Sequence, residues 1–442
     1  MQKRFAAFLL ILSLCPVVIS KANAQAVQPA QSADISGLWV ATAIVMGEPR
    51  VGRFVFKVDG EKLTGTGLNG LSINGKLNGS QLEFGLWTPS GMPRATLKGT
   101  VENGEMRGTV VFNGQPGTWT AERPATRPAD APRVHTFEPK QFHRLFSGTI
   151  EPVLKIFPGD TVHTWSVDAG GTDHQSVRRS LGGNPQTGPF YIEGALPGDT
   201  LVVQLKRVRL NRDFAVSGSS IVGSALAPYY LQGIKEVPNF DSKWKLDRER
   251  GVATLANPTE KLKNFSITLR PMLGCVGVAP PRNQAFATGD LGPYGGNMDY
   301  NEVREGTTLY LPVFQTGALL FMGDGHAAQG DGELTGDALE TSMEIEFAVD
   351  VIQGKSAGGP RAENDEYLMA FGIGGSLQEA LQRATTGLAQ WIESDYKLNA
   401  AEVAVVLGTS IRYDVAELVD PHIHVVAKIR KSALAQINKE GK

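Results

Sequence analysis

The sequence predicts a mainly β or α+β protein in which a small antiparallel barrel or sandwich precedes a larger strand-rich domain with helices near the C-terminus. Residues 33–123 alternate polar and apolar side chains in short runs that are separated by Asn-Gly and Asp-Gly pairs. Beyond residue 134, β-branched runs recur up to about Val351, and helical periodicity is concentrated after residue 375. A chain of 442 residues with 41% hydrophobic residues can bury more than one core.

The first module is predicted from its turns. Asn-Gly and Asp-Gly accept the positive φ angles that tight β-hairpin turns require. Six such pairs begin at Asp59, Asn69, Asn74, Asn78, Asn103 and Asn113. The segments 54–58, 81–84 and 109–112 have the composition of strands. The module contains no histidine and its acids lie mostly beside turns, so we interpret it as an accessory module without a catalytic site.

A linker and two helices complete the predicted organisation. Residues 124–134 are rich in Pro and Ala, which predicts an extended linker before a larger domain over 135–442. Ser376 and Glu379 have the spacing of a helical capping box, and Asn399 with Glu402 predicts a second helix that runs to about Gly408. The first helix has one apolar face, assigned to the core, made of Leu377, Ala380, Leu381, Ala384, Leu388, Trp391 and Ile392.

Residues 1–24 have the pattern of a bacterial secretory signal peptide. Lys3 and Arg4 precede an apolar run over 5–19, and Ala22-Asn23-Ala24 supplies small residues at the cleavage positions. A retained membrane anchor is the alternative, but the run is shorter than the roughly 20 residues that a spanning helix needs. We therefore expect cleavage after Ala24 and an exported protein, periplasmic or secreted, without a membrane span.

Composition excludes some partners and bonds. The 43 basic and 45 acidic residues are mixed along the chain and give a net charge of −2, which argues against nucleic acid as a partner. Removal of the leader would leave Cys275 as the only cysteine, so no intramolecular disulfide is expected. Cys275 lies in an apolar strand-like run, which predicts a buried, inert thiol.

The glycine-rich stretch from Gly323 to Glu333 is the best candidate for a reaction centre. It places His326 among three carboxylates, Asp324, Asp331 and Glu333, and its other residues are Gly, Ala and one Gln. A solvated turn would explain the glycines and acids but not the single histidine. Small neighbours leave room for a metal or a substrate at this point.

A catalytic metal needs about three protein ligands and an open position. His326 is the leading nitrogen ligand, and Asp168, Asp299 and Glu340 are the leading oxygen donors, because these acids lie beside Gly, Asn or Thr. For each acid, a role as a capping group or an exposed charge is the alternative.

The other histidines have simpler interpretations. His163 shares a strand face with Trp165 and is expected in the core or at its rim. His422 and His424 alternate along a strand and could bind a metal, but they have no nearby acid or third histidine in the sequence, so they too are expected in the core or at its rim. His135 and His143 lie near the linker and are expected at the surface.

Two further motifs of nucleophilic and phosphate chemistry are absent from the sequence. It contains no Ser-x-x-Lys with its partner motifs and no phosphate-binding P-loop. Metal-assisted hydrolysis is the chemistry that remains for an enzyme with these residues.

Several ordered motifs together resemble the acetamidase/formamidase family. They are 164–168 (TWSVD), 184–189 (NPQTGP), 193–201 (EGALPGDTL), 295–299 (GGNMD), 305–313 (EGTTLYLPV), 323–333 (GDGHAAQGDGE) and 340–343 (ETSM). The resemblance extends from about His135 to the C-terminus and does not include the N-terminal module.

Membership of this family implies a strand-rich amidase domain, self-association as a homodimer or a larger homo-oligomer, and hydrolysis of short linear amides such as formamide or acetamide to a carboxylic acid and ammonia. It also implies a divalent metal, with Zn²⁺ favoured. On this chain the resemblance places the metal at Asp168, Asp299, His326 and Asp324. Glu333 is the first candidate for the general base and Glu340 the second. Asn297 is a candidate donor to the developing oxyanion.

Export and the added β module depart from the compact family pattern, so two alternatives stay open. The substrate could be a lactam or another cyclic amide. The chain could also be a non-catalytic envelope protein, in which the metal only stabilises the fold and the first module binds a glycan or another envelope component.

Overall fold

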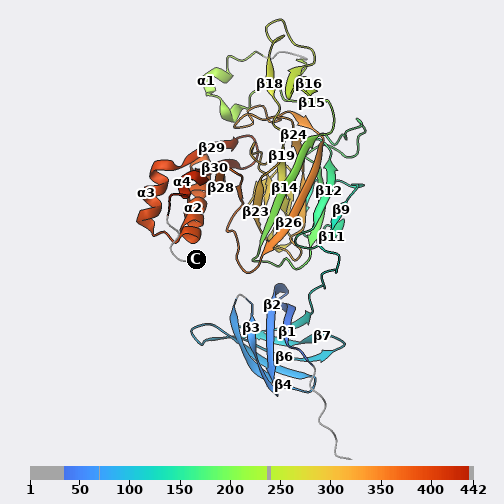
Figure 1. The fold of residues 1–442 in the computed structure, drawn as a ribbon, viewed down its shortest axis with the longest axis vertical. Helices are drawn as coiled ribbons and strands as arrows, with labels where there is room; N and C mark the ends of the chain where they lie inside the picture. Colours follow the sequence, from blue (N-terminus) through green and yellow to red (C-terminus); the bar gives the residue numbers. More distant parts are fainter. Residues whose placement is uncertain (1–33, 69, 236–239, 438–442) are drawn as a thin grey trace, which may run out of the picture.

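The computed structural model describes residues 34–68, 70–235 and 240–437. The predicted leader over 1–24 and its cleavage site lie outside the described residues. Within them the protein is mainly β, as the sequence predicts, with an N-terminal barrel, a larger two-sheet domain and helices near the C-terminus (Figure 1). Among these residues no helix combines the length and the apolar character that crossing a membrane requires.

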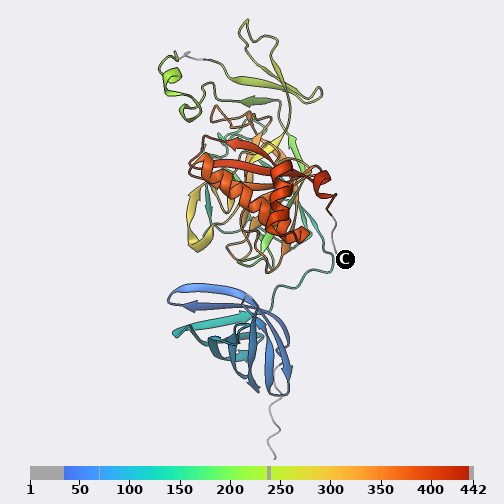
Figure 2. The same ribbon diagram turned by 90° about the vertical axis from the view of Figure 1, so that its left-hand side faces the viewer.

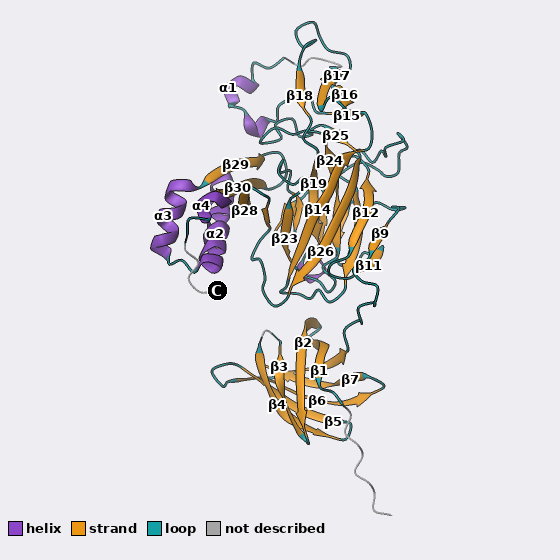
Figure 3. Ribbon diagram, in the orientation of Figure 1, coloured by secondary structure: helices purple, strands orange, loops and turns teal. Residues whose placement is uncertain are grey.

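The N-terminal barrel is closed by eight antiparallel strands in sequential order. Its last strand pairs with its first through the register Val40↔Glu122 to Val45↔Gly117. Figure 3 shows the barrel below the larger domain. Its strands are β1 (Gly37–Val45), β2 (Glu48–Asp59), β3 (Lys62–Gly67), β4 (Leu71–Asn78), β5 (Gln81–Trp87), β6 (Pro93–Glu102), β7 (Glu105–Phe112) and β8 (Gln115–Glu122).

Aromatic side chains fill the barrel. Phe54, Phe56, Phe84 and Trp119 are buried and meet edge to face or tilted, with ring centroids 5.3 to 6.3 Å apart. Such edge-to-face pairs add to the stabilisation from burial alone. A pocket among these side chains has a volume of only about 10 Å³, as expected for a barrel interior filled by side chains.

One arginine joins the barrel to the larger domain. Arg53 on β2 donates to both carboxylate oxygens of Asp199, over 2.9 and 2.7 Å, and to the carbonyl oxygen of Gly194. Asp199 is buried and also accepts from the backbone N–H groups of Leu196 and Gly354. This bidentate pair fixes the β2 side of the barrel against the larger domain.

The larger domain is built on two sheets. The nine-stranded sheet has the order β29-β30-β28-β27-β23-β14-β26-β12-β9. Its strands are β9 (Val134–Thr136), β12 (Thr161–Ser166), β14 (Thr200–Leu210), β23 (Thr308–Pro312), β26 (Met343–Ile352), β27 (Arg361–Glu363), β28 (Tyr367–Gly374), β29 (Arg412–Glu417) and β30 (Ile423–Arg430). The main β14–β26 ladder is antiparallel and runs from Thr200↔Ile352 to Leu210↔Met343.

The second sheet has eleven strands and carries the candidate site. Its main path is β18-β17-β16-β15-β25-β24-β19-β22-β21, and β13 connects β24 to β11. Its strands are β11 (Leu154–Ile156), β13 (Gln186–Ile192), β15 (Phe214–Val216), β16 (Lys243–Asp247), β17 (Val252–Leu255), β18 (Ser266–Thr268), β19 (Met272–Val278), β21 (Leu291–Gly292), β22 (Gly295–Asn297), β24 (Leu320–His326) and β25 (Glu340–Thr341). β10 (Leu145–Ser147) and β20 (Ala285–Ala287) form a separate pair.

A shared apolar core lies between the two sheets. It includes Val203 and Phe347 from the nine-stranded sheet and Val276 and Phe321 from the eleven-stranded sheet. Strands β19 and β24 are therefore covered on their inner face, and all seven residues of each are buried. Cys275 on β19 is one of them, and burial raises the pKa of its thiol well above the usual value, as expected for an inert cysteine.

Helices cover one side of the nine-stranded sheet (Figure 2). α2 (Leu377–Tyr396) begins at Ser376, whose side chain accepts from the backbone N–H of Glu379, and α3 (Ala400–Ser410) has the predicted capping box of Asn399 and Glu402. α3 continues two residues beyond Gly408. The short helices are η1 (Gly223–Ala225), α1 (Pro228–Leu231), η2 (Pro281–Asn283) and α4 (Lys431–Leu434).

The prediction that the whole apolar face of the first helix is buried is wrong for two residues. Ala380, Ala384, Leu388, Trp391 and Ile392 are buried against β28 and β30, but Leu377 and Leu381 are 47% and 42% exposed. These two leucines lie in the first turns, at the edge of the contact with the sheet, so they stay in solvent.

Candidate metal centre

The end of β24 places two polar side chains on one face of a fully buried strand. Asp324 and His326 are two residues apart, so both point to the same side of the sheet. The ladder with β19 keeps one register from Met272↔His326 to Val278↔Leu320, in which Gly274 lies opposite Asp324. Asp324 has φ 57°, a left-handed conformation inside a strand. In this conformation the Asp324 carboxylate lies beside the histidine, with Oδ1 3.6 Å from Nε2.

Two groups of three side chains converge on His326. Asp299, His326 and Glu333 form one group, and Asp324, His326 and Glu340 form the other, with the ligand atoms of each group within 4.8 Å of one another. The His326 Nε2 atom lies 3.1 Å from Glu340 Oε1, 3.6 Å from Asp324 Oδ1 and 3.9 Å from Asp299 Oδ1. All five side chains are buried.

Four polar atoms at the centre are buried without a hydrogen-bond partner: His326 Nε2, Asp299 Oδ1, Asp324 Oδ1 and Glu340 Oε2. One orphaned buried polar atom costs about 1 to 3 kcal/mol, and more when it is charged, so four that converge are not expected without a ligand. A divalent cation beside His326 Nε2 would satisfy orphaned carboxylate oxygens of this kind, since imidazole nitrogen and carboxylate oxygen are its usual donors. The residues therefore fit a metal ion.

Gln329 fixes the orientation of the histidine. Its Nε2 amide donates to the carbonyl oxygens of Asp299 and Ala416, so its Oε1 faces the His326 ring and accepts from Nδ1 at 2.9 Å. A neutral His326 then carries its proton on Nδ1 and directs the Nε2 lone pair at the three carboxylates. Hydrogen bonding of this kind behind a histidine ligand is usual in metal sites.

An amide pair connects three of the acids. Asn297 Nδ2 donates to Asp299 Oδ2 and Asp420 Oδ2, both at 2.6 Å, and Asn297 Oδ1 accepts from Asn184 Nδ2. Asn184 Nδ2 also donates to Asp324 Oδ2 at 3.1 Å. Both N–H bonds of Asn297 are thus engaged with carboxylates. In this arrangement Asn297 orients Asp299 and has no free N–H for the oxyanion role that the sequence suggested.

Burial and mutual repulsion perturb the acids. Burial raises the pKa of Asp299 and Glu333 well above their usual range. Burial, with the Asp324 charge, raises the pKa of Glu340 to about 7, although His326 opposes the shift. Burial would lower the pKa of His326, but the carboxylates of Glu340 and Asp324 outweigh it and raise that pKa. A bound cation would favour the ionised form of every one of these acids.

Two further acids extend the cluster toward β30. Burial raises the pKa of Asp420 to about 7 and that of Glu417 to about 8. Glu417 accepts from the backbone N–H groups of Val419 and Asp420, and its Oε1 atom is buried without a partner. The turn after β29 therefore adds two buried carboxyl groups, of which Asp420 accepts from Asn297.

Backbone strain is concentrated at this centre. Asn184, Asp299, Asp324 and Glu333 have φ angles of 51°, 40°, 57° and 44°. Non-glycine residues adopt this region rarely, at a cost of about 1 to 3 kcal/mol each, and such residues cluster at functional sites. The surrounding sheet holds them in place to orient their side chains.

Gly274 forms the floor of the centre. A Cβ atom at this position would lie 2.3 Å from Asp299 Oδ1, 2.7 Å from Asp324 Oδ2 and 3.0 Å from His326 Cε1. Only glycine lets these three groups approach the β19 backbone, whose Gly274 carbonyl accepts from the N–H of Asp299 at 3.0 Å.

The structure places Asp168 outside both groups. Its Oδ2 accepts from the buried Arg212 at 2.7 Å and its Oδ1 from the backbone N–H of Thr172. Arg212 also donates to Thr341 Oγ1 and to the carbonyl oxygen of Glu340. The guanidinium of Arg212 stands between Asp168 and β25, so Asp168 supports the backbone of Glu340.

The remaining histidines lie away from His326. His163 Nε2 is 2.9 Å from Glu344 on the outer face of the sheet, and His422 Nδ1 is 3.0 Å from Asp290. His424 is buried, with Nδ1 2.6 Å from the carbonyl oxygen of Met298. The surface position expected for His143 is wrong, because its ring is partly buried and its Nε2 is enclosed.

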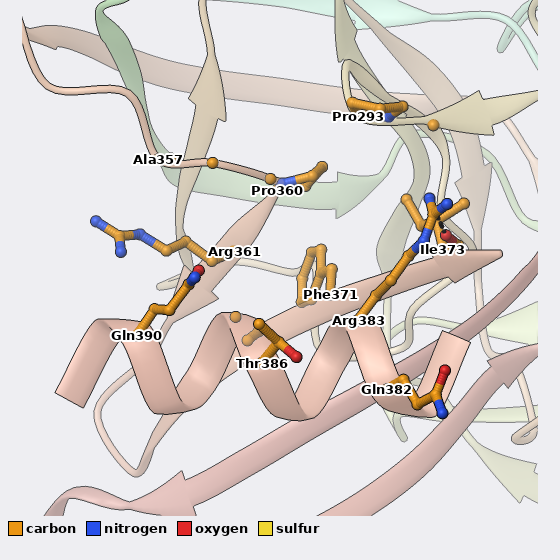
Figure 4. A pocket seen from close by; sticks show the side chains of 15 residues that line it. Pro293, Ala357, Pro360, Arg361, Phe371, Ile373, Gln382, Arg383, Thr386 and Gln390 are labelled. Atoms are coloured by element: carbon orange, nitrogen blue, oxygen red, sulfur yellow. Dashed lines mark hydrogen bonds between the residues drawn. The ribbon is translucent and has the colours of Figure 1, made fainter. Parts of the chain in front are cut away.

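A separate pocket of about 410 Å³ lies between α2 and the 357–361 segment. Figure 4 shows Phe371 inside it, with Arg383 and Thr386 extending from the helix. Phe371 contacts Tyr300, which follows Asp299 in the sequence, and His424, with ring centroids 5.6 and 5.0 Å apart. It is lined by no acid or histidine and is not the reaction site.

Sequence reasoning missed Gly274, Asn184, Gln329, Glu417 and Asp420. Asn184 and Gln329 lie inside motifs that were singled out, and the spacing of Gln329 three residues after His326 was an available signal. Asp420 is 94 residues from His326 along the chain and carries no local signal.

Fold and site define a two-sheet β protein with a buried histidine and carboxylate centre suited to a divalent metal. The family model described as the Acetamidase/Formamidase family matches residues 292–367. The formamidase of Methylophilus methylotrophus is 24% identical over 271 residues, which cover 48% of this chain and 64% of that protein. The acetamidase of Mycolicibacterium smegmatis is 26% identical over 221 residues, covering 38% and 53%. The chain thus spans less than two thirds of these curated relatives.

Solved structures cover more of the fold. An acetamidase from Yersinia enterocolitica is 28% identical with a TM-score of 0.59, covering 71% of this chain and 96% of that one. An acetamidase from Bacillus halodurans has the same TM-score at 24% identity, covering 69% and 99%. Over its larger domain the chain is therefore similar to members of the acetamidase/formamidase family, and it has an additional N-terminal barrel.

Proposed function

We propose that this chain is a metal-dependent amidase that hydrolyses the C–N bond of short linear amides to a carboxylic acid and ammonia. The observation that carries the proposal is that His326 Nε2, Asp299 Oδ1 and Asp324 Oδ1 are buried without partners, inside two overlapping groups of possible metal ligands. Relatives named formamidase and acetamidase support the substrate class.

The proposed chemistry divides between the ion and the side chains. A bound divalent ion supplies a Lewis acid and lowers the pKa of a water molecule toward about 7. Asp299, Asp324 and His326 hold the ion, with Glu333 and Glu340 beside them. Gln329 keeps the Nε2 lone pair of His326 directed at the site, and Asn297 orients Asp299.

The contacts of Glu340 make it the first candidate for the general base, ahead of Glu333, which reverses the order that the sequence indicated. Glu340 Oε1 accepts from the backbone N–H of Ala338, which fixes the carboxylate, while Oε2 has no partner. The free oxygen takes the proton of the attacking water and passes it to the departing nitrogen. We propose Zn²⁺ as the ion, because the set combines one imidazole with carboxylates.

The decisive test is ammonia release from formamide, acetamide, longer linear amides and lactams. We expect activity on short linear amides that chelation removes and Zn²⁺ restores, and a fall of at least about 10³-fold in His326→Ala because the ion is lost. His163→Ala is the matched control. Metal analysis accompanies each assay. A folded, metal-free His326→Ala protein with the parent's activity would refute the proposal, and activity on lactams alone would move it to cyclic amides.

Export and self-association belong to the same proposal. We propose cleavage after Ala24 and a periplasmic or secreted homo-oligomer, on the leader-like pattern of residues 1–24 and on the family resemblance. N-terminal sequencing of the protein from its producing cells and sedimentation analysis test these two points.

A further inference from the structure

The outer face of the barrel carries an exposed tryptophan over a glycine. Trp87 ends β5, and its side chain is 37% exposed. Gly85, two residues earlier, occupies an outward position of the same strand, because the flanking Phe84 and Leu86 point into the core. A Cβ atom at Gly85 would lie 2.6 Å from Trp87 Nε1 and 3.1 Å from Cε2. Glycine thus lets the indole lie along the sheet.

This placement leaves part of the ring surface open to solvent. The ring covers Gly85 from outside, and a depression of about 560 Å³ extends from it across β4, β5 and β6. Hydrogen-bonding groups line the depression: Asn74 and Thr96 flank Gly85 on the neighbouring strands, Gln81 lies at the start of β5, and Lys98 forms a 3.0 Å ion pair with Glu83.

The depression is far from the contact with the larger domain. In the closed barrel, β5 is four strands from β1 in either direction, and the Arg53 contact is made from β2. Figure 1 shows β4 at the lower end of the barrel and β2 toward the larger domain. A pocket inside the barrel has a volume of only about 10 Å³, whereas the outer depression has about 560 Å³.

We propose that Trp87 and the depression on β4–β6 form a saccharide-binding site. A pyranose ring has faces made of C–H groups and a rim of hydroxyls. A flat indole takes the C–H face, and amide, hydroxyl and charged groups around it pair with the rim. The site needs no cavity inside the barrel, and it attaches the hydrolase to a polymer without blocking the metal centre.

Titration calorimetry on the full chain tests the site with four soluble hexasaccharides: those of β-1,4-linked N-acetylglucosamine, β-1,4-linked glucose, α-1,4-linked glucose and β-1,4-linked xylose. Sorbitol is the polyol control. We expect at least one to bind with a Kd between about 1 μM and 1 mM, a range usual for shallow sites. Trp87→Ala then weakens binding at least about 10-fold, and Trp87→Phe by much less because a flat ring remains.

Tyr229→Ala, which removes an 81% exposed aromatic from the larger domain, is the matched control and keeps full affinity. Ammonia release is unchanged in all three variants, so failure here is separate from failure of the proposed amidase. Either of two results refutes the proposed saccharide site. In one, no hexasaccharide binds better than sorbitol; in the other, Trp87→Ala binds the hexasaccharide as tightly as the parent does. The saccharide proposal is also refuted if no saccharide binds and the chain self-associates in a way that Trp87→Ala abolishes. That result would indicate a protein partner at this face.

Discussion

The barrel and the larger domain differ in the polar side chains that they bury. Among the described residues of the barrel, every buried side chain that is not glycine is apolar or aromatic, and the indole N–H groups of Trp39 and Trp119 bond to backbone carbonyls. The larger domain buries Asp299, Asp324, His326, Glu333, Glu340 and Glu417 close together. Packing stabilises the first core, whereas the second contains charge that favours unfolding unless a cation compensates it.

The largest expected effect comes from adding a side chain at Gly274, beneath the charged centre. Gly274→Ala places a methyl group where Asp299 and Asp324 approach the backbone, so we expect metal content and amide hydrolysis to fall at least about 10³-fold. Gly289→Ala is the control, because no atom lies within 4 Å of the added Cβ. Metal analysis and ammonia release measure the effect. Full metal content in Gly274→Ala would show that the acids do not converge on a cation.

The opposite experiment makes a cavity in the barrel. Phe84→Ala removes a ring that meets three other aromatic rings, which should cost about 3 to 5 kcal/mol of barrel stability. Calorimetry should show one transition shifting down while the transition of the larger domain and the metal content stay unchanged. Val111→Ala, at a 47% exposed position of the barrel, is the control. A common shift of a single transition would contradict the predicted separation at residues 124–134.

A smaller effect is expected from pH on the metal-free protein. Burial raises the pKa of Glu417 from 4.5 to about 8, so between these values the folded state binds more protons than the unfolded state. Stability should therefore fall as pH rises from about 5 to about 8, by on the order of 3 kcal/mol for this group. Urea unfolding with chelator measures the slope. Glu417→Gln should flatten it, and a slope that rises with pH would contradict the assignment.

Much of the fold could be predicted from the sequence because the patterns that define its strands and helices are local. Asn-Gly turns and alternating side chains predicted strands of the barrel, and Ser376 and Asn399 predicted where the two main helices begin. The solvent exposure of Leu377 and Leu381 was not predictable, because a helical apolar face does not tell how far the partner sheet extends.

By itself the sequence determined the class of fold, the family resemblance and the type of centre. The loop from Gly323 to Glu333 combines a histidine, carboxylates and small residues, and their chemistry alone favours a metal. Tertiary structure decided which groups meet. In the folded chain, Asp299 and Glu340 lie beside His326, and Asp168 pairs with Arg212. Asn297 donates to two carboxylates, one of which belongs to Asp420. Side chains that are distant along the chain meet only where two sheets pack, and the position of that contact depends on the whole core and not on any local pattern.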